Sequence, residues 1–287
     1  MDATEPGTLD ALLPPAMAAK AEQVGVAKAH LPLRRLIPLG VLAGAFIALG
    51  ANFSTVVTAG GGMAPGIARL LGGVVFALGL VLVVVSGAEL FTGNTLIVMA
   101  YASRKVTATA LLRNWGVVYV SNFVGAAATA ALVVASGKLS AGDGSVGVRA
   151  MATADAKGGL DFGEAIVSGV LANSLVCLAV WMTLSARTLT DKVIVIVPPV
   201  AAFVAAGFEH SVANMYFFPA ALLHREWAGD EFWVATDTTA AQYTHLGWRE
   251  FLLDNLVPVT IGNIIGGAVL VGLVYWFVYR APEAHTV

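Results

Sequence analysis

Residues 207–214 read Gly-Phe-Glu-His-Ser-Val-Ala-Asn, and residues 87–94 read Gly-Ala-Glu-Leu-Phe-Thr-Gly-Asn. Both octapeptides have a glutamate two residues after the first glycine and an asparagine five residues after that glutamate. Both lie inside long apolar stretches, where ionisable side chains are costly and where glycine weakens a helix. We therefore predict that each octapeptide interrupts a membrane helix, and that the two interruptions are equivalent.

The composition of the chain indicates that its solvent is lipid. The 287 residues are 58% hydrophobic and 12% charged, whereas a soluble domain has roughly 25% charged residues. The net charge of −2 offers no basic face, so we expect no nucleic acid partner. The single cysteine, Cys177, excludes an internal disulfide framework and a cysteine-rich metal site, and we predict neither a metal nor a cofactor.

Six apolar stretches are long enough to cross a bilayer, which requires about 20 apolar residues. They cover residues 36–59, 68–102, 107–136, 161–185, 190–217 and 250–279. The second is too long for one simple crossing and contains Glu89 and Thr92, and the fifth contains Glu209 and His210. The sequence therefore predicts an all-α membrane protein with six transmembrane helices, of which the second and fifth are interrupted.

The distribution of Lys and Arg predicts that both termini lie in the cytoplasm, because positive residues favour the inner side. With that orientation the inner side holds Lys20, Lys28, Arg34, Arg35, Arg104, Lys105, Arg113, Arg187, Lys192 and Arg280. The outer side holds Arg69, Lys138, Arg149, Lys157, Arg225 and Arg249. We expect a cytoplasmic segment over 1–33 that includes an amphipathic helix through 12–29, a membrane domain over 34–280 and a cytoplasmic tail over 281–287.

Further matches between the two halves indicate an internal repeat. Gly-Val-Leu-Ala occurs at 40–43 and again at 169–172. An asparagine pair separated by seven residues occurs at Asn114 and Asn122, and again at Asn255 and Asn263. Three spans per half is an odd number, so the halves, about 36–136 and 161–279, must be inserted upside down relative to each other. Inverted repeats with interrupted helices place a permeation site between them, near the midplane.

His210 is the strongest candidate for a group that meets the permeating solute. Its neutral ring can donate a hydrogen bond to an anion, and its cation can pair with one or pass a proton to it. Ionisable residues at membrane depth mark transport pathways by default. The alternative is a buried histidine that satisfies a carbonyl group.

The other polar residues near the interruptions have two readings each. Glu89 and Glu209 would repel an anion, so we expect their carboxylates to accept hydrogen bonds from the broken backbone, with a proton relay as the alternative. Thr92 offers a hydroxyl to a solute or caps a kink. Lys157 draws anions into an outer vestibule or is an ordinary solvated lysine.

Four asparagines complete the set of polar candidates. Asn173 and Asn263 face the interior by the repeat argument, and they bind helix to helix or bind the solute. Asn94 and Asn214 close the two octapeptides, where we expect a structural role.

Several segments together make the chain resemble the formate/nitrite transporter family over roughly residues 30–280. They are Ala-Glu-Leu-Phe-Thr-Gly-Asn at 88–94, Asn-Trp at 114–115 with Asn-Phe-Val-Gly-Ala at 122–126, Leu-Ala-Asn at 171–173, Gly-Phe-Glu-His-Ser-Val-Ala-Asn-Met at 207–215 and Pro-Val-Thr-Ile-Gly-Asn-Ile-Ile-Gly-Gly at 258–267. The resemblance implies an aquaporin-like fold, a homopentamer with one pore per protomer, and transport of formate, nitrite, hydrosulfide or a related weak-acid anion.

The resemblance also implies roles for individual residues. His210 matches the central pore histidine of the family, Thr92 the hydroxyl that faces it, and Lys157 the vestibule lysine. Asn173 and Asn263 match pore asparagines. Leu80, Leu90 and Phe91 match constriction positions on the cytoplasmic side, and Phe76 and Phe203 match positions on the periplasmic side. The bulky set Phe76, Leu80, Phe91 and Phe203 is similar to that of formate channels. Residues 138–156 and 218–249 depart from the family pattern in length or composition.

We therefore expect a multi-pass channel of a bacterial inner membrane that carries formate with proton coupling. Nitrite, hydrosulfide, lactate or acetate transport by the same fold remains an alternative, as does a neutral-solute channel for water, glycerol or ammonia. The absence of aquaporin-type Asn-Pro-Ala motifs argues against the neutral-solute channel. An enzyme would need a nucleophile–base pair or a metal cluster. His210 has no second histidine at membrane depth, and its candidate companions there are only Cys177, Glu89 and Glu209, so we do not expect an enzyme.

Overall fold

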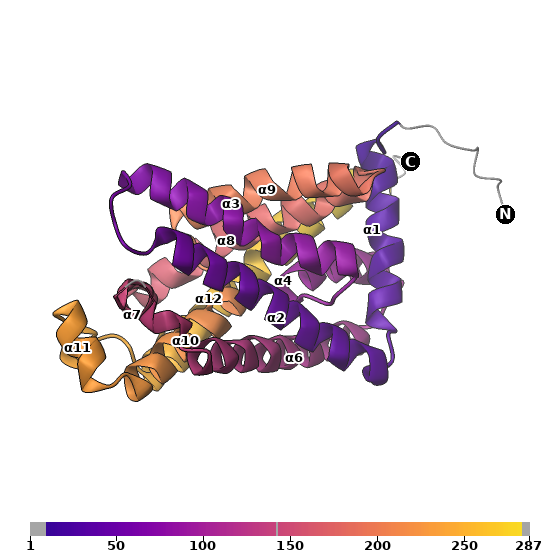
Figure 1. Cartoon of the computed structure of the whole chain (residues 1–287). Helices are drawn as coiled ribbons and strands as arrows, with labels where there is room; N and C mark the ends of the chain where they lie inside the picture. Colours follow the sequence, from indigo (N-terminus) through magenta and orange to yellow (C-terminus); the bar gives the residue numbers. More distant parts are fainter. Residues whose placement is uncertain (1–9, 142, 283–287) are drawn as a thin grey trace.

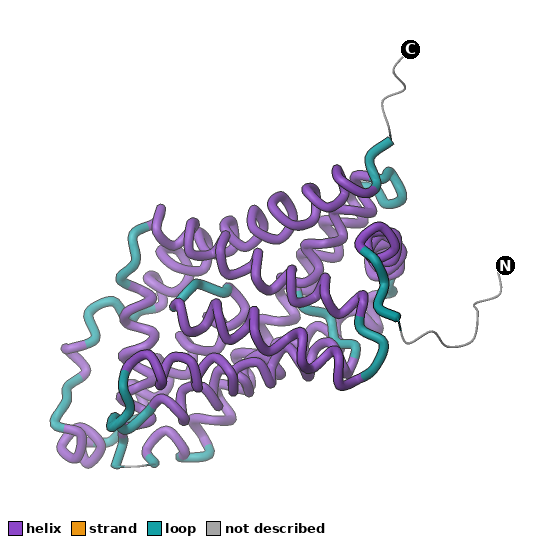
Figure 2. The backbone as a smooth tube through the Cα atoms, turned by 90° about the horizontal axis from the view of Figure 1, so that it is seen from above, coloured by secondary structure: helices purple, strands orange, loops and turns teal. Residues whose placement is uncertain are grey.

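The computed structural model describes residues 10–141 and 143–282, and these residues form helices joined by loops, with no strand among them (Figures 1 and 2). Residues 1–9 of the predicted N-terminal segment and 283–287 of the predicted tail lie outside this description. Six helices are long and apolar enough to cross a membrane, and they are α2 (Leu33–Thr58), α3 (Pro65–Ser86), α6 (Ala108–Ala135), α8 (Phe162–Ser185), α9 (Leu189–Ala206) and a last helix over Glu250–Tyr279. The prediction of an all-helical protein with six such helices is confirmed.

The last helix alternates between π-helical and α-helical winding. It consists of η4 (Glu250–Leu256), α12 (Val257–Ile264), η5 (Ile265–Leu273) and α13 (Val274–Tyr279). π-Helical turns are rare in proteins, and those that occur often lie at functional sites. Here they flank α12, which carries Asn263.

Helix α3 stops in the middle of the second apolar stretch. It ends at Ser86, and Gly87 follows in the left-handed conformation with φ of 72°. Such a conformation ends helices and suits glycine, which has no Cβ. After an extended link the chain forms α4 (Phe91–Asn94), a short 3₁₀ turn η1 (Thr95–Ile97) and α5 (Val98–Ala102).

Helix α9 stops in the same way in the fifth stretch. It ends at Ala206, and Gly207 has φ of 78°. Helix α10 (Ser211–Trp227) then begins after His210, which has extended backbone angles. Pro198 and Pro199 lie inside α9 and do not end it.

Glycines allow the long helices to cross with their backbones in contact. A Cβ atom at Gly125 of α6 would lie 1.9 Å from the carbonyl oxygen of Val41 in α2. A Cβ atom at Gly262 of α12 would lie 2.1 Å from the carbonyl oxygen of Ile166 in α8. Small residues serve the same purpose at other membrane helix crossings, because close backbones gain van der Waals contact.

Shorter helices lie at the two ends of the bundle. Helix α1 (Pro14–Ala29) lies across one end (Figure 1), where Met17 and Ala21 pack in a cluster with Met99 and Trp181. At the other end are η2 (Lys138–Ser140), α7 (Ser145–Gly158), α11 (Asp230–Thr236) and η3 (Ala240–Gln242). The sequence did not predict α7, which occupies the region treated as an outer connection.

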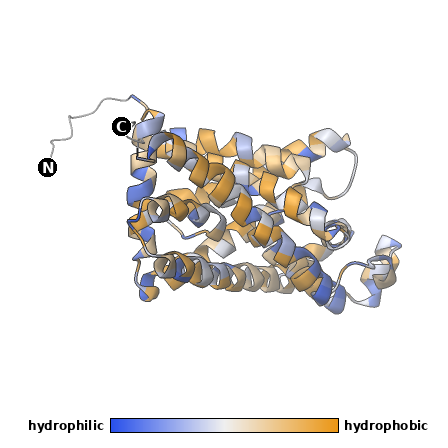
Figure 3. Ribbon diagram, turned by 180° about the vertical axis from the view of Figure 1, so that it is seen from behind, coloured by the Kyte–Doolittle hydropathy of each residue, from blue (hydrophilic) through white to orange (hydrophobic). Residues whose placement is uncertain are grey.

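The surface of the bundle is apolar along the long helices, and the hydrophilic residues gather at the two ends (Figure 3). On α6, for example, Leu112, Val120, Val124 and Leu132 are all exposed. A continuous apolar face of this kind marks a membrane or a protein interface, because it would be unfavourable in water.

Candidate functional site

The interruption between α3 and α4 is held by the side-chain amide of Asn122 in α6. Its Oδ1 accepts from the backbone N–H of Phe91 at 2.9 Å. Its Nδ2 donates to the carbonyl oxygens of Gly40 at 2.7 Å and Glu89 at 2.9 Å. Backbone groups freed by a helix break must find partners when no water is present. Asn122 binds two of them, at Phe91 and Glu89, and its third bond joins the break to Gly40 of α2.

The interruption between α9 and α10 is held by Asn263 in α12 through the corresponding contacts. Asn263 Oδ1 accepts from the N–H of Ser211 at 2.9 Å. Its Nδ2 donates to the carbonyl oxygens of Gly169 at 2.8 Å and Glu209 at 3.0 Å. Each partner occupies the position in the second half that corresponds to the partner of Asn122 in the first.

The carboxylate of Glu89 is buried and neutralised by side chains. Its oxygens accept from Lys28 Nζ of α1 and from Asn94 Nδ2, each at 2.7 Å. Asn94 Nδ2 also donates to Asn114 Oδ1 at 2.9 Å, and Asn114 in turn donates to the carbonyl oxygen of Lys28 at 2.9 Å.

The carboxylate of Glu209 has the same environment at the other end. It accepts from Lys157 Nζ of α7 at 2.7 Å and from Asn214 Nδ2 at 2.7 Å. Asn214 Nδ2 also donates to Asn255 Oδ1 at 2.6 Å, and Asn255 donates to the carbonyl oxygen of Lys157 at 3.0 Å. The expectation that these carboxylates accept from broken backbone was wrong about the donors, which are lysine and asparagine side chains.

His210 and Thr92 meet between the two interruptions. The Nε2 of His210 lies 2.9 Å from Thr92 Oγ1, and its Nδ1 accepts from the N–H of Ala213 at 3.1 Å as the N-cap of α10. A ring nitrogen that accepts a hydrogen bond carries no proton, so the network assigns the proton to Nε2. The neutral imidazole therefore donates from Nε2 to the Thr92 hydroxyl.

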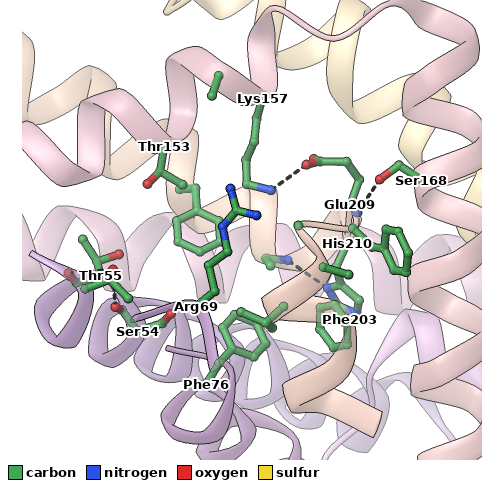
Figure 4. Close-up of a pocket in the computed structure, with 18 of the residues that line it drawn as sticks. Ser54, Thr55, Arg69, Phe76, Thr153, Lys157, Ser168, Phe203, Glu209 and His210 are labelled. Atoms are coloured by element: carbon green, nitrogen blue, oxygen red, sulfur yellow. Dashed lines mark hydrogen bonds and ion pairs between the residues drawn. The ribbon is translucent and has the colours of Figure 1, made fainter. Parts of the chain in front are cut away.

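A cavity of about 410 Å³, which we call the vestibule, leads to His210 from the end of the molecule that carries α7. Its walls come from α2, α3, α7, α8, α9 and α10, and Figure 4 shows Arg69, Lys157 and His210 directed into it. Lys157 Nζ also lies 5.4 Å from the centre of the Phe217 ring. The vestibule joins the protein surface to the buried histidine.

A much smaller cavity of about 10 Å³ lies on the far side of His210. Phe76 and Phe203 line both cavities, and their rings pack edge to face with centres 5.7 Å apart. Leu80 and Leu90 also line the small cavity. A site needs about 10–15 Å³ to hold one water molecule, so formate, with three heavy atoms, does not fit in this conformation.

Phe91 does not line either cavity next to His210. Its ring packs on Tyr119 and Trp115 of α6, with ring centres 4.9 Å and 6.3 Å away. The structure thus groups Phe76, Phe203, Leu80 and Leu90 around the histidine and places Phe91 against the neighbouring helix.

Asn173 is fully buried and bound to other helices. Its Nδ2 donates to the carbonyl oxygen of Asn263 at 2.6 Å and lies 3.3 Å from both Thr92 O and Thr95 Oγ1. Neither Asn173 nor Asn263 lines the vestibule or the small cavity. Of the two readings of these asparagines, the contacts favour helix-to-helix binding.

The sequence analysis missed Lys28, which occupies the position in the first half that corresponds to Lys157 in the second. Gly40 follows Lys28 by the same twelve residues by which Gly169 follows Lys157, and the spacing was available in the repeat. Arg69 and Arg149, which both line the vestibule, were noted only as outer charges.

Comparison with known proteins decides the family. The sequence model described as "Formate/nitrite transporter" matches residues 15–277. The chain belongs to the formate/nitrite transporter family. The resemblance inferred from the sequence is confirmed, and the family is one of transporters and not of enzymes, as predicted.

One similar relative is the formate channel FocA of Escherichia coli (strain K12), which is 47% identical over 277 residues, 96% of this chain and 97% of the relative. A solved structure described as a pentameric formate channel with formate bound has a TM-score of 0.83 and 44% identity, and the match covers 87% of this chain and 98% of that one. A structure described as a family ion channel has a TM-score of 0.73 and 29% identity, with 94% and 98% coverage.

Proposed function

We propose that this protein is a channel for formate in a bacterial inner membrane, assembled as a homopentamer with one passage in each protomer. The support is a relative named as a formate channel with 47% identity and a pentameric formate channel with 44% identity. The six apolar helices support residence in a membrane. Both termini lie in the cytoplasm, so the vestibule opens to the periplasm.

The observation that carries the proposal is the buried contact between His210 and Thr92. The two side chains, 2% and 0% exposed, bring one N–H and one hydroxyl together. His210 lines both cavities, and Thr92 lies directly behind it without lining either. Formate can accept from the N–H and from the hydroxyl, so it can replace the contact that they make with each other. We infer that this pair is the central binding point of the passage.

The architecture that we propose is aquaporin-like, with two inverted three-helix repeats over about 36–136 and 161–279. The second and fifth helices are interrupted, and the six-helix domain over 34–280 lies between a cytoplasmic segment and a cytoplasmic tail. The support is the set of corresponding contacts made by Asn122 and Asn263, together with those made by Glu89 and Glu209.

The route begins with attraction of the anion into the vestibule towards Lys157. The anion then passes Phe76 and Phe203, meets His210 and Thr92, and leaves past Leu80 and Leu90. A charge at the membrane centre costs at least about 3 kcal/mol, so passage is easier for the neutral acid. Three residues support the route without lining it. Phe91, Asn173 and Asn263 hold α4 and α10 in place.

In this proposal transport is coupled to a proton. The hydrogen bonds of the two ring nitrogens of His210 limit how His210 can supply that proton. Loss of the Nε2 proton from a neutral ring would leave an imidazolate anion, which is unfavourable. Full transfer from His210 therefore requires a second proton on Nδ1, which breaks the contact with the Ala213 N–H. Formate therefore receives its proton either from water or from a His210 ring that carries a proton on both nitrogens, and in both cases His210 holds the anion by a hydrogen bond.

Proteoliposomes with an internal pH-sensitive dye test the proposal, with protein-free liposomes as the control. We expect external formate to acidify the interior faster than in the control, and swelling in glycerol to match the control. Nitrite, hydrosulfide, lactate and acetate in the same assay rank the alternatives. Glycerol flux without formate flux would instead identify a neutral-solute channel. Native mass spectrometry is expected to give five chains per particle.

A further inference from the structure

The positive charge of the vestibule does not come mainly from the lysine. Lys157 is held by Glu209 at 2.7 Å, and the side chains are only 15% and 2% exposed. Seen from the mouth of the cavity, such a pair is nearly neutral, because the two charges cancel at distances much larger than their separation. Among the residues that line the vestibule, Glu209 is the single carboxylate, whereas the cations are Lys157, Arg69 and Arg149. Two arginine charges therefore remain without compensation.

Arg69 and Arg149 lie about two helical turns along α3 and α7 from Phe76 and Lys157, respectively. On α7, Arg149, Thr153 and Lys157 follow one another at four-residue spacing and all line the cavity, as expected for one face of a helix. With a rise of 1.5 Å per residue, Arg149 lies about 12 Å along α7 from Lys157. On α3, Arg69 lies about 10 Å before Phe76 by the same measure.

The two guanidinium groups are close enough to influence each other. Partial burial and then the charge of Arg69 lower the pKa of Arg149 from its ordinary value. Arg149 Nε donates to Thr58 Oγ1 at 3.2 Å, which fixes the side chain and leaves both terminal nitrogens for a ligand. Among the residues that the structure describes, neither arginine has a carboxylate within ion-pair distance. Figure 4 shows the Arg69 side chain extending towards Lys157.

We propose that Arg69 and Arg149 form an anion-binding site in the vestibule, separate from His210, which captures small carboxylates before they reach the constriction. Guanidinium groups present planar pairs of N–H donors that match a carboxylate. The inference deepens the proposed function and rests on it, since captured formate moves inward from this site to the Lys157–Glu209 pair.

Coulomb attraction gives the size of the effect. Two unit charges about 11 Å from an anion in a water-like medium raise its local concentration about fourfold, and salt reduces this gain. The site therefore lowers the formate concentration needed for half-saturation and leaves the maximal rate unchanged, because the arginines lie outside the constriction.

The first test is formate uptake by right-side-out membrane vesicles at about 0.01 M and about 0.15 M salt, where the Debye lengths are about 30 Å and 8 Å. For Arg69→Gln/Arg149→Gln we expect a half-saturation concentration about two- to threefold higher at low salt, where screening is weak, an unchanged maximal rate, and little difference at high salt. Arg249→Gln, which removes an exposed arginine that does not line the vestibule, is the control. Arg69→Lys/Arg149→Lys keeps both charges and is expected to restore low-salt uptake.

The second test does not depend on transport. Malonate carries two carboxylates, one for each guanidinium, and its double charge keeps it from the apolar constriction. Calorimetric titration of the purified protein is expected to show malonate binding that Arg69→Gln/Arg149→Gln loses and Arg249→Gln keeps. Equal binding in wild type and the double glutamine variant would overturn the inference. Wild-type vesicles that take up no formate would instead overturn the proposed function, whatever malonate does.

Discussion

His210 has two tasks that use its two ring nitrogens. Nδ1 caps α10 by accepting from Ala213, and Nε2 donates to Thr92. A substitution at this position therefore changes the stability of a helix as well as the chemistry of the passage. The two effects separate because asparagine is among the best N-cap residues and alanine is a poor one.

We expect His210→Asn to keep the cap and to remove the titratable ring, whereas His210→Ala loses the cap at a cost of about 1 kcal/mol. Thermal unfolding in detergent should place His210→Asn close to wild type and His210→Ala below it. In vesicles, His210→Asn should retain some formate flow with weaker dependence on external pH. A pH profile identical to that of the wild type would contradict the role of His210 in proton coupling.

The buried pair of Lys157 and Glu209 predicts strong coupling between two substitutions. Lys157→Gln leaves a buried carboxylate without its cation, and breaking such a pair costs about 3–5 kcal/mol. Lys157→Gln/Glu209→Gln leaves two neutral amides, and Asn214 and Asn255 still offer hydrogen bonds to residue 209.

The double variant should consequently be more stable than Lys157→Gln alone in thermal unfolding. Lys138→Gln, an exposed lysine at the same end, should have little effect in either background. Losses that simply add would show that the charges do not compensate each other in the folded protein.

The sequence predicted which residues form the site more successfully than it predicted their hydrogen-bond partners. His210 and Thr92 were expected to face each other, and they do so at 2.9 Å. The sequence left two roles open for Asn173, because the same amide donor and acceptor can bind either a solute or the backbone of a broken helix. The partner of Glu89 was missed, because Lys28 lies in a segment that hydropathy treats as outside the membrane.

At the scale of elements, the helix crossings depend on glycines that leave no room for a side chain. A methyl at Gly125 would lie 1.9 Å from Val41 O, and a methyl at Gly266 would lie 2.2 Å from Val170 O. Each clash is with backbone, so the helices themselves would have to move apart. The two crossings involve corresponding helices of the two halves, α2 with α6 and α8 with the last helix.

We therefore expect Gly125→Ala and Gly266→Ala to lower the thermal stability of the assembled protein by several degrees. Gly116→Ala on the same helix as Gly125 is the control, because nothing lies within 4 Å of its added methyl. Since alanine favours a helix by about 0.5–1 kcal/mol over glycine, Gly116→Ala should be neutral or stabilising. Equal stability of Gly125→Ala and Gly116→Ala would contradict the close crossing.

The long helices follow from hydropathy, and the remaining elements do not. The second apolar stretch, 68–102, contains α3, α4, η1 and α5, and periodicity could not place those boundaries. Helix α7 was missed because it is short and half polar, and its position is fixed by contacts such as Lys157 with Glu209. The π-helical turns of the last helix could not be predicted from its hydropathy pattern.

At the scale of the whole molecule, one buried carboxylate binds the N-terminal helix to the end of the bundle opposite α7. Glu22 of α1 is 0% exposed and accepts from Ser103, Lys105 and Arg280. Burial raises the pKa of Glu22, but the hydrogen bonds from Arg280, Lys105 and Ser103 outweigh it, so the pKa lies below the ordinary value of 4.5. The ionised form thus stabilises the docked helix.

Because the folded pKa is depressed, this stabilisation is fully present above about pH 4.5 and is lost as the pH falls through the lowered pKa. We expect Glu22→Gln to expose α1 at neutral pH, with amide exchange about tenfold faster, since a charged hydrogen bond contributes about 1.5 kcal/mol. Glu231→Gln at the opposite end is the control. Exchange in α1 that is the same in both variants would show that Glu22 does not hold the helix.

The small size of the cavity beside the His210 ring also has a consequence for the proton gradient across a membrane. Protons hop along unbroken files of water, and an open file through a channel would discharge the membrane. A gap that admits at most one water molecule interrupts any such file. In this conformation the channel therefore blocks proton flow, and a solute can enter only if the rings of Phe76 and Phe203 move apart.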